Sequence, residues 1–158
     1  MSAVGPVAKG PLIYLAARYS RREELIAYGQ ELAVAGIGRV EARWLTEEHD
    51  WDGSESPEGL AIAQKYATDD VEDLAAAHAV VVFSEPPGEC RRGGRHVEYG
   101  KAVGLRKHVI VVGPLENVFY GLPTVPRFAD WEQAKAHLAA WREAVERSAR
   151  IKRLTLPS

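Results

Sequence analysis

Residues 79–104 read AVVVFSEPPGECRRGGRHVEYGKAVG. This stretch opens with five apolar residues, Ala79–Phe83, and such a run is typical of a buried strand. A polar, glycine-rich loop follows, and Val97–Gly104 then has the small and apolar residues of a packed helix. In open α/β sheets, ligands bind at loops of this kind after a buried strand. The stretch therefore predicts both the fold class and the position of a binding site.

The rest of the chain repeats this alternation of strand and helix. Further strands are predicted at Leu12–Ala17, Gly38–Trp44, His108–Val112 and Val125–Phe128. Strands that alternate with helices are typical of a parallel sheet covered on both faces. We therefore expect a single-domain α/β fold, flavodoxin-like or Rossmann-like, with a parallel five-stranded sheet in the order 2-1-3-4-5 flanked by helices.

Short polar motifs predict where three of the helices begin. The motifs Ser20-Arg-Arg-Glu23 and Asp130-Trp-Glu-Gln133 have the spacing of a capping box, in which the first side chain binds a backbone N–H of the first turn. Ser56-Pro57 predicts another start, with proline at the first helical position. The helix after Asp130 is expected to reach about Leu154.

Size and composition limit the classes of protein to consider. A chain of 158 residues usually forms one domain, and we expect a flexible leader at 1–11 followed by a domain at 12–155. The net charge of -2 gives no general attraction to nucleic acid, and the single cysteine excludes an internal disulfide framework. No apolar run approaches the roughly 20 residues of a membrane span. We expect a cytoplasmic protein that uses no cofactor and no metal and binds neither nucleic acid nor membrane.

The glycine-rich loop has the features of an anion site. Gly93 and Gly94 allow backbone N–H groups to approach a ligand, and the helix that follows adds partial positive charge. Arg92 and Arg95 add full charges, and a guanidinium binds phosphate in a fork. Glu98 is expected in the first helical turn, facing the same space. The alternatives are a solubilising charge cluster for the arginines and a helix-dipole contact for Glu98.

Three segments together resemble the nucleoside 2-deoxyribosyltransferase family, which includes the deoxynucleoside 5'-monophosphate N-glycosidases. They are residues 12–17, 70–82 and 94–110. The resemblance spans residues 12 to about 112. It implies an enzyme that breaks or exchanges the N-glycosidic bond of a nucleoside or nucleotide, and it implies at least a homodimer in which neighbouring subunits complete each other's sites.

The resemblance also implies roles for individual residues. Glu98 would attack the anomeric carbon, Asp73 would match the family aspartate near the sugar and base, and Tyr14 would orient the nucleophile. Members that use free nucleosides carry an aspartate six positions before the nucleophile, where this chain has Arg92. An arginine pairs well with phosphate, so we expect a 5'-monophosphate substrate.

Three other functions stay open. They are a transferase of free nucleosides, a nucleotide-binding sensor without turnover, and a phosphoribohydrolase of the cytokinin-activating type. The last carries a Pro-Gly-Gly-x-Gly-Thr pattern that this chain lacks.

Further candidates for substrate binding lie near the ends of the predicted strands. Trp44 could stack on a base, Asp70 could bind sugar or base, and Asn117 could reach a substrate across a subunit boundary or form an Asx-turn. The full set of substrate-binding candidates is Ala17, Arg18, Trp44, Asp70, Ser84, Arg92, Gly93, Gly94, Arg95, His96 and Asn117. The C-terminal helix has an apolar stripe that favours a subunit contact.

Overall fold

The computed structural model describes residues 10–88 and 93–155, so residues 1–9 of the expected leader and Arg92 lie outside the described residues. In the described part, four parallel strands form one sheet in the order β1-β2-β3-β4. The strands are β1 Ile13–Ala16, β2 Ala79–Phe83, β3 His108–Val112 and β4 Arg127–Phe128. The predicted α/β class, with a parallel sheet flanked by helices, is confirmed.

The expected second strand, Gly38–Trp44, is replaced in the described residues by a single bridge. Leu12 and Arg39 pair in parallel, and the Ile13 N–H donates to the Arg39 carbonyl at 2.9 Å. The chain then leaves the sheet because the Arg43 N–H donates to the Asp73 carboxylate at 2.7 Å instead of to a neighbouring strand. The segments keep the expected order, but the sheet has four strands where five were predicted.

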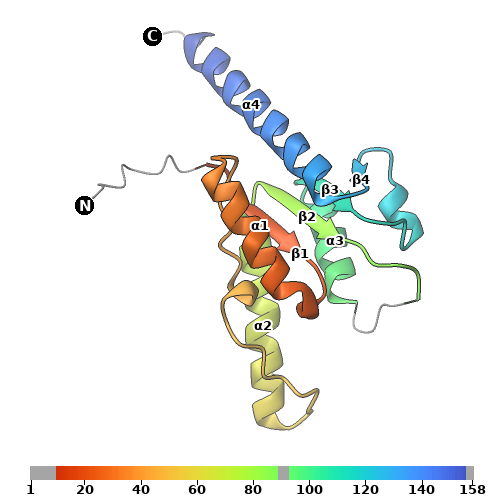
Figure 1. The fold of residues 1–158 in the computed structure, drawn as a ribbon. Coiled ribbons are helices and arrows are strands. Elements are labelled where there is room, and N and C mark those ends of the chain that lie inside the picture. Colours follow the sequence, from red (N-terminus) through yellow and green to blue (C-terminus); the bar gives the residue numbers. More distant parts are fainter. Residues whose placement is uncertain (1–9, 89–92, 156–158) are drawn as a thin grey trace.

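Helices cover both faces of the sheet (Figure 1). They are α1 Arg22–Val34, α2 Pro57–Ala76, α3 Gly94–Gly104 and α4 Trp131–Thr155. On one face, the Tyr28 ring of α1 stacks on Phe83 of β2 and on Trp131 of α4, with centroid distances of 5.6 and 4.4 Å. On the other face, Tyr14 of β1 meets α3. The result is a three-layer arrangement with the sheet in the middle.

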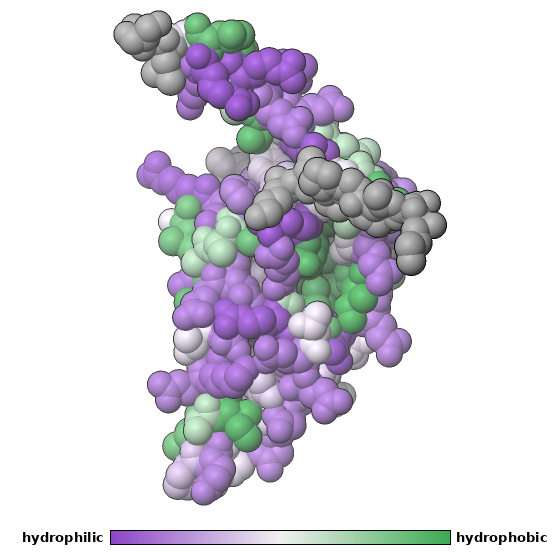
Figure 2. Space-filling model, turned by 90° about the vertical axis from the view of Figure 1, so that its left-hand side faces the viewer, coloured by the Kyte–Doolittle hydropathy of each residue, from purple (hydrophilic) through white to green (hydrophobic). Residues whose placement is uncertain are grey.

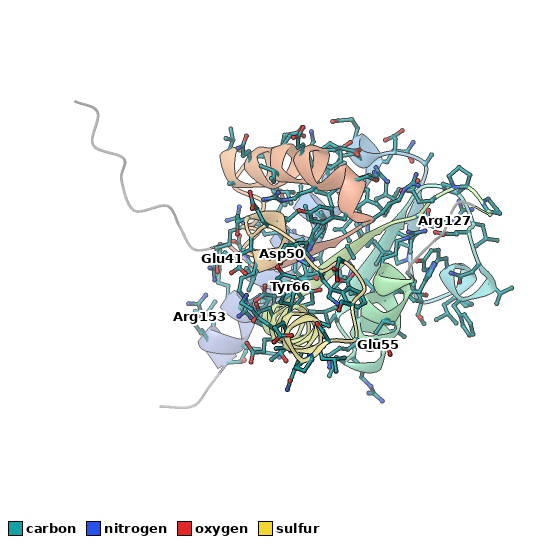
Figure 3. The ribbon with its side chains drawn as sticks, turned by 90° about the horizontal axis from the view of Figure 1, so that it is seen from below. Glu41, Asp50, Glu55, Tyr66, Arg127 and Arg153 are labelled. Carbon is teal, nitrogen blue, oxygen red and sulfur yellow. The ribbon has the colours of Figure 1, made fainter. Side chains whose placement is uncertain are left out.

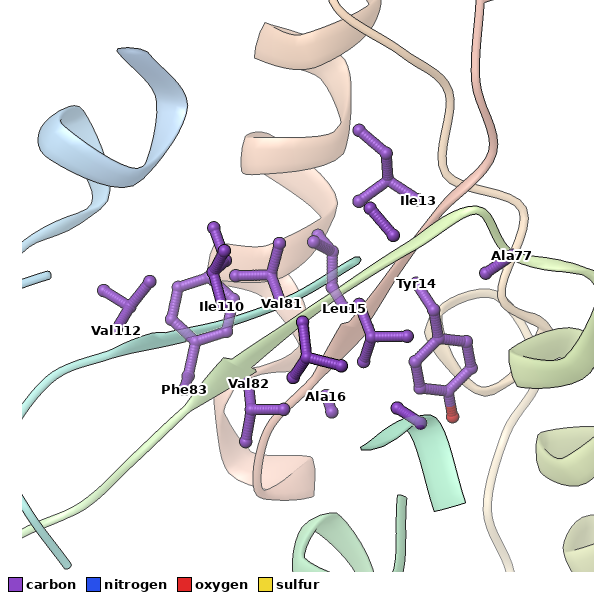
Figure 4. Packing of buried hydrophobic residues seen from close by; sticks show 14 of the residues in the cluster. Ile13, Tyr14, Leu15, Ala16, Ala77, Val81, Val82, Phe83, Ile110 and Val112 are labelled. Carbon is purple, nitrogen blue, oxygen red and sulfur yellow. The ribbon is translucent and has the colours of Figure 1, made fainter. Parts of the chain in front are cut away.

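The strands are apolar because both of their faces are covered. Every residue of β1 and β2 is buried. Figure 4 shows Leu15, Val81 and Ile110 packed together at the centre of this core. Side chains of a strand alternate between the two faces, so Tyr14 points away from Leu15 and turns its hydroxyl towards α3 (Figure 4). The packing of the core therefore fixes the Tyr14 hydroxyl beside α3.

Two of the three predicted helix starts are confirmed. The Ser56 hydroxyl accepts a hydrogen bond from the Gly59 N–H at 3.1 Å, with Pro57 at the start of the helix. The Asp130 carboxylate accepts one from the Gln133 N–H at 2.9 Å. The prediction for Ser20 is wrong. A 3-10 turn, Tyr19–Arg21, precedes α1, and no side chain caps either element.

Helix α3 begins three residues earlier than predicted. Its cap is Gly93, whose φ of 68° lies in the left-handed region that favours glycine. Because the helix starts at Gly94, Glu98 falls in its second turn and not in the first. The helix dipole acts mainly within the first turn, so it gives little reason for a glutamate at position 98. The alternative interpretation of Glu98 as a helix-dipole contact is therefore weakened.

Helix α4 extends beyond the body of the molecule (Figure 1). Residues 143–155 of this helix are all exposed. Hydrophobic side chains lie among hydrophilic ones at its projecting end, at the top of Figure 2, and Leu154 is 80% exposed. The predicted contact between subunits stays a prediction. None of the helices in the described part of the chain has the length and apolar character that a membrane span requires.

Candidate active site

A cavity of about 780 Å³ opens beyond the carboxyl end of β1, between the loop after that strand and helices α2 and α3. Its volume lies in the range of small-molecule sites. It occupies the place that the glycine-rich loop predicted. The cavity is lined by Ala17, Arg18, Tyr19, Ser20, Trp44, His49, Trp51, Ala63, Tyr66, Ala67, Asp70, Gly93, Gly94, Arg95 and Glu98.

Glu98 lines this cavity from α3 and is bound by Tyr14 from β1. The Tyr14 hydroxyl donates to Glu98 Oε1 at 2.5 Å. The pKa of Glu98 is raised to about 7, chiefly by burial and also by the charge of Asp70, while the Tyr14 hydrogen bond and Arg95 partly offset the rise. Burial and the charge of Glu98 also raise the pKa of Tyr14, so this hydroxyl stays a donor. The pair thus holds one carboxyl group that is close to half ionised at neutral pH.

Asp70 faces the same cavity from α2. Burial raises its pKa to about 6, and the nearby charges of Asp73 and Asp69 add to the effect, which Arg43 and Tyr14 partly offset. Two acids with separated and raised pKa values around one cavity are typical of a site for acid–base or nucleophilic chemistry. The cavity therefore contains a proton donor and an anion near neutral pH.

Asp73, the aspartate matched to the family, does not line this cavity. Its carboxylate accepts hydrogen bonds from the Arg43 backbone N–H at 2.7 Å and from Arg43 Nε at 2.9 Å. Arg43 also meets Asp69 and Glu72, at 2.7 and 3.0 Å. The structure thus places Asp73 in an ion-pair cluster around Arg43, beside the site and not in it.

Two of the predicted arginines reach the cavity, and both meet a carboxylate. Arg18 Nη2 donates to Glu85 at 2.9 Å, and Arg95 Nη2 donates to Glu116. Gly93 and Gly94 line the cavity beside them. A helix N-terminus with two guanidinium groups nearby favours an anionic part of a ligand. Arg92, which lies outside the described residues, adds nothing to this description.

Three predicted residues lie behind the wall of the cavity. The Ser84 hydroxyl donates to the Pro114 carbonyl at 2.7 Å. His96 Nδ1 lies 2.8 Å from the Tyr120 hydroxyl, and Asn117 Nδ2 lies 3.2 Å from the same nitrogen. Asn117 Oδ1 accepts from the Phe119 N–H at 3.0 Å, which is the Asx-turn that was the alternative for this residue. A role for Asn117 in the site of a second subunit stays a prediction.

Aromatic rings form much of the cavity wall. Trp44, as predicted, lies there, and its indole N–H donates to the Leu15 carbonyl at 3.1 Å, which fixes the ring. Two flat side chains that were not predicted, His49 and Tyr66, are stacked with a centroid distance of 4.1 Å. Figure 3 shows Tyr66 close to Asp50, and a hydrogen bond joins their side chains.

Trp51 and Tyr19 complete this set of rings. Trp51 follows directly on the polar stretch that contains His49, so an aromatic residue in an otherwise polar loop was the signal in the sequence. The flat faces of such rings suit a planar heterocycle. Among the described residues, no group of three or more His, Cys, Asp or Glu side chains is arranged to hold a metal ion.

Comparisons with known proteins show that solved structures share this architecture. No protein-family model matches the chain, and a search of curated proteins finds no match. Among solved structures, a 2-deoxyribosyltransferase from Bacillus psychrosaccharolyticus is similar, with a TM-score of 0.58 and 18% identity over 80% of this chain and 95% of that one. The CMP N-glycosidase BcmB of Clostridium botulinum gives a TM-score of 0.47 and 19% identity over 82% of this chain and 97% of that one.

The first similarity shows the fold. The chain has the architecture of a 2-deoxyribosyltransferase that is described as a biocatalyst for the synthesis of antiviral and antitumoral nucleosides. The resemblance seen in the sequence is therefore confirmed at the level of the fold. Both similar proteins are enzymes by their names.

Proposed function

We propose that this protein cleaves the N-glycosidic bond of a (2'-deoxy)nucleoside 5'-monophosphate, releases the base, and passes the glycosyl group to water or to another base. The hydrogen bond between Tyr14 and Glu98 carries the proposal, because it fixes a buried carboxyl group in a cavity of nucleotide size. With Oε1 bound to Tyr14, Glu98 Oε2 is the oxygen that can attack a substrate.

The proposed reaction has two steps. The Glu98 carboxylate attacks the anomeric carbon as the bond from that carbon to the base nitrogen breaks, which gives a glycosyl ester. The Asp70 carboxylic acid donates its proton to the leaving base and becomes a carboxylate. Asp70 then takes a proton from water, the resulting hydroxide attacks the anomeric carbon, and Glu98 leaves as a carboxylate. A second base that replaces the water gives transfer.

The proposal gives Asp70 the part first assigned to Asp73. Asp70 lines the cavity and its pKa is raised to about 6, whereas the oxygens of Asp73 are occupied by Arg43. A general acid must carry a proton, and with a pKa of about 6 Asp70 is protonated in about one molecule in ten at pH 7. The proposed reaction uses this fraction, which grows as the pH falls towards 6.

The substrate binds in two parts in this proposal. Arg18, Arg95 and the Gly93–Gly94 backbone surround the 5'-phosphate, and Arg92 keeps its predicted role there. The rings of Trp44 and Trp51 bind the base. Selection for phosphate needs only a modest difference in free energy, since each 1.4 kcal/mol changes the ratio of specificity constants about tenfold.

Substitution of Glu98 tests the reaction. Glu98→Gln keeps the shape of the side chain and a hydrogen-bond acceptor for Tyr14 but removes the nucleophile, so base release from a panel of nucleoside monophosphates should be abolished. Glu143→Gln, on the exposed part of α4, is the matched control and should retain activity. Near-normal turnover in folded Glu98→Gln would rule out this role. A 2'-fluoro analogue should add its sugar mass to Glu98.

Transfer between free nucleosides is the second candidate. One observation favours it: Arg18 and Arg95 already have carboxylate partners, which reduces the positive charge available to a phosphate. The specificity constants for a monophosphate and its nucleoside decide between the two. We expect the monophosphate to be preferred about one hundredfold. Arg92→Ala should remove most of this preference. Equal constants would favour the transferase, and nucleotide binding without any base release would indicate a sensor.

A further inference from the structure

Two buried acids behind the cavity hold the two arginines that line it. The side chains of Arg95 and Glu116 form an ion pair in which each is 4% exposed. Glu85, whose side chain is 8% exposed, pairs with Arg18. The two acids are joined to each other, because the Glu85 N–H donates to Glu116 Oε2 at 3.0 Å. A continuous polar chain therefore runs behind the cavity wall, from the loop after β1 to α3.

The Glu116 side chain binds the Arg95 guanidinium. The guanidinium donates through Nη2 to Glu116 Oε1, and its Nε is buried without a partner among the described residues. His96 is a second, weaker neighbour of Glu116, since its Nε2 lies 3.6 Å from Oε1. A buried guanidinium keeps one orientation only when an anion fixes it, so the position of Arg95 depends on the reach of the Glu116 side chain.

Arg95 in turn is a neighbour of Glu98. The two residues are three positions apart on α3, which places them on one face of the helix, and both line the cavity. The other ionisable groups around Glu98 are Tyr14 from β1 and Asp70 from α2, and Arg18 lines the same cavity from the loop after β1. Arg95 is thus the cation that α3 itself brings beside the carboxyl group.

We propose that Glu116 is a positioning residue, which holds the Arg95 guanidinium on the cavity wall beside Glu98 and so keeps a cation next to the attacking oxygen. The inference rests on the proposed role of Glu98. Glu116 lies outside the cavity lining and acts through Arg95. Its contribution is to make the charge of Arg95 act at one place, where it favours the ionised form of Glu98.

The ionisation of Glu98 tests the inference without any turnover. The side-chain carboxyl carbons of the full chain are labelled with carbon-13 on glutamate and titrated by NMR, and the Glu98 signal is the one missing in Glu98→Gln. Glu116→Gln removes the charge but keeps an oxygen that binds Arg95. Glu116→Asp keeps the charge but shortens the reach by one methylene. Glu143→Gln is the control for a lost negative charge far from the site.

The two variants should shift the Glu98 titration in opposite directions. Glu116→Gln removes a negative charge that partly cancels the positive charge of Arg95. Glu98 should therefore titrate at lower pH. With Glu116→Asp the guanidinium is drawn back, so Glu98 should titrate higher, by about one pH unit. The acid side of the pH profile for base release should move with the titration. Glu143→Gln should leave both unchanged.

Shifts in the same direction, or an unchanged titration in Glu116→Asp, would overturn the inference, because only the lost charge would then matter. Circular dichroism verifies folding. If Glu116→Asp does not fold, the double variant Arg95→Gln/Glu116→Gln replaces it and must titrate higher than Glu116→Gln alone, or the inference fails. A protein that releases no base from any nucleotide would refute the proposed function and still leave this titration measurable.

Discussion

Helix α2 presents acidic side chains to two different surroundings. Asp70 faces the cavity, where it meets Glu98, while Asp69, Glu72 and Asp73 surround the guanidinium of Arg43. Only three positions separate Asp70 from Asp73. The acids around Arg43 hold the segment after α1 against α2. The cavity group has raised pKa values because burial outweighs the help of any cation. Asp73 is bound directly by a guanidinium, whereas the pKa of Asp70 is raised chiefly by burial.

The largest difference between the two groups should appear in catalysis. We expect Asp70→Asn to lower kcat for base release about one hundredfold or more, because the amide cannot donate an acidic proton to the leaving base. Asp73→Asn should stay within about threefold of the unmutated protein, since its carboxylate serves Arg43. Steady-state kinetics on the same nucleotide compares them. A larger loss in Asp73→Asn would return the catalytic role to that residue.

The burial of Glu98 in the cavity should also lower the free energy of unfolding at neutral pH. The folded-state pKa of Glu98, about 7, lies above its ordinary value of 4.5, so its contribution to stability is complete below pH 4.5 and is lost as the pH rises to about 7. Glu98→Gln avoids this loss. We expect the variant to be more stable than the unmutated protein by about 3 kcal/mol at pH 8 and no more stable at pH 4.5. Urea unfolding at the two pH values measures this. An equal effect at both would show that burial of the charge is not the cause.

The pH dependence of activity should show two limbs. The active form combines an ionised Glu98 with a protonated Asp70, and it is a minority form because Glu98 has the higher pKa, about 7 against about 6. Its population changes little between pH 6 and 7 and declines on both sides of this range. Because the acids interact, the two values belong to the pair. We expect kcat/KM to be highest near pH 6.5 and to fall about tenfold per pH unit well outside this range. In Asp70→Asn the decline on the alkaline side should disappear. Its persistence would assign that limb to another group.

The smallest effect should come from the Arg43 group. Asp73→Asn loses the ion pair with Arg43 and one of the two carboxylate oxygens that accept hydrogen bonds from that residue. The Arg43 side chain is 35% exposed. Since exposed pairs contribute little, we expect a loss of about 1 kcal/mol in the free energy of unfolding, or a fall of about 2–4 °C in Tm. Asp70→Asn should not lower Tm. A lower Tm in that variant would mean that the cavity acid also supports the fold.

Much of the fold could be predicted from local sequence. The runs at 79–83 and 109–112 are continuously apolar because helices cover both faces of the sheet. The segment 38–44 alternates charged and apolar residues, a pattern that also suits a strand, but in the described residues it pairs with the sheet only at the Leu12–Arg39 bridge. Its backbone is drawn away by Asp73, a partner 30 positions further along the chain from Arg43. No short-range pattern contains that interaction.

The position of the candidate site could also be predicted from local sequence. Glu98 and the paired glycines were predicted from the glycine-rich loop after a buried strand, and Tyr14 from the resemblance to the 2-deoxyribosyltransferase family. The choice between Asp70 and Asp73 depends on how α2 is rotated against the sheet, and the sequence of one helix does not specify this. His49 and Trp51 reach the cavity through the path of a loop, which is set by contacts such as the Lys65–Glu47 ion pair at 2.7 Å.

The bond between Tyr14 and Glu98 joins residues 84 positions apart. During synthesis the tyrosine leaves the ribosome first, and its partner follows only after α2 and β2 have emerged. Contacts this distant in sequence form slowly, because a long loop must close before they are made. A nascent or partly folded chain therefore lacks the assembled Tyr14–Glu98 pair. The capacity to consume nucleotides would appear only in molecules that have finished folding, so activity itself would report on the last stage of that process.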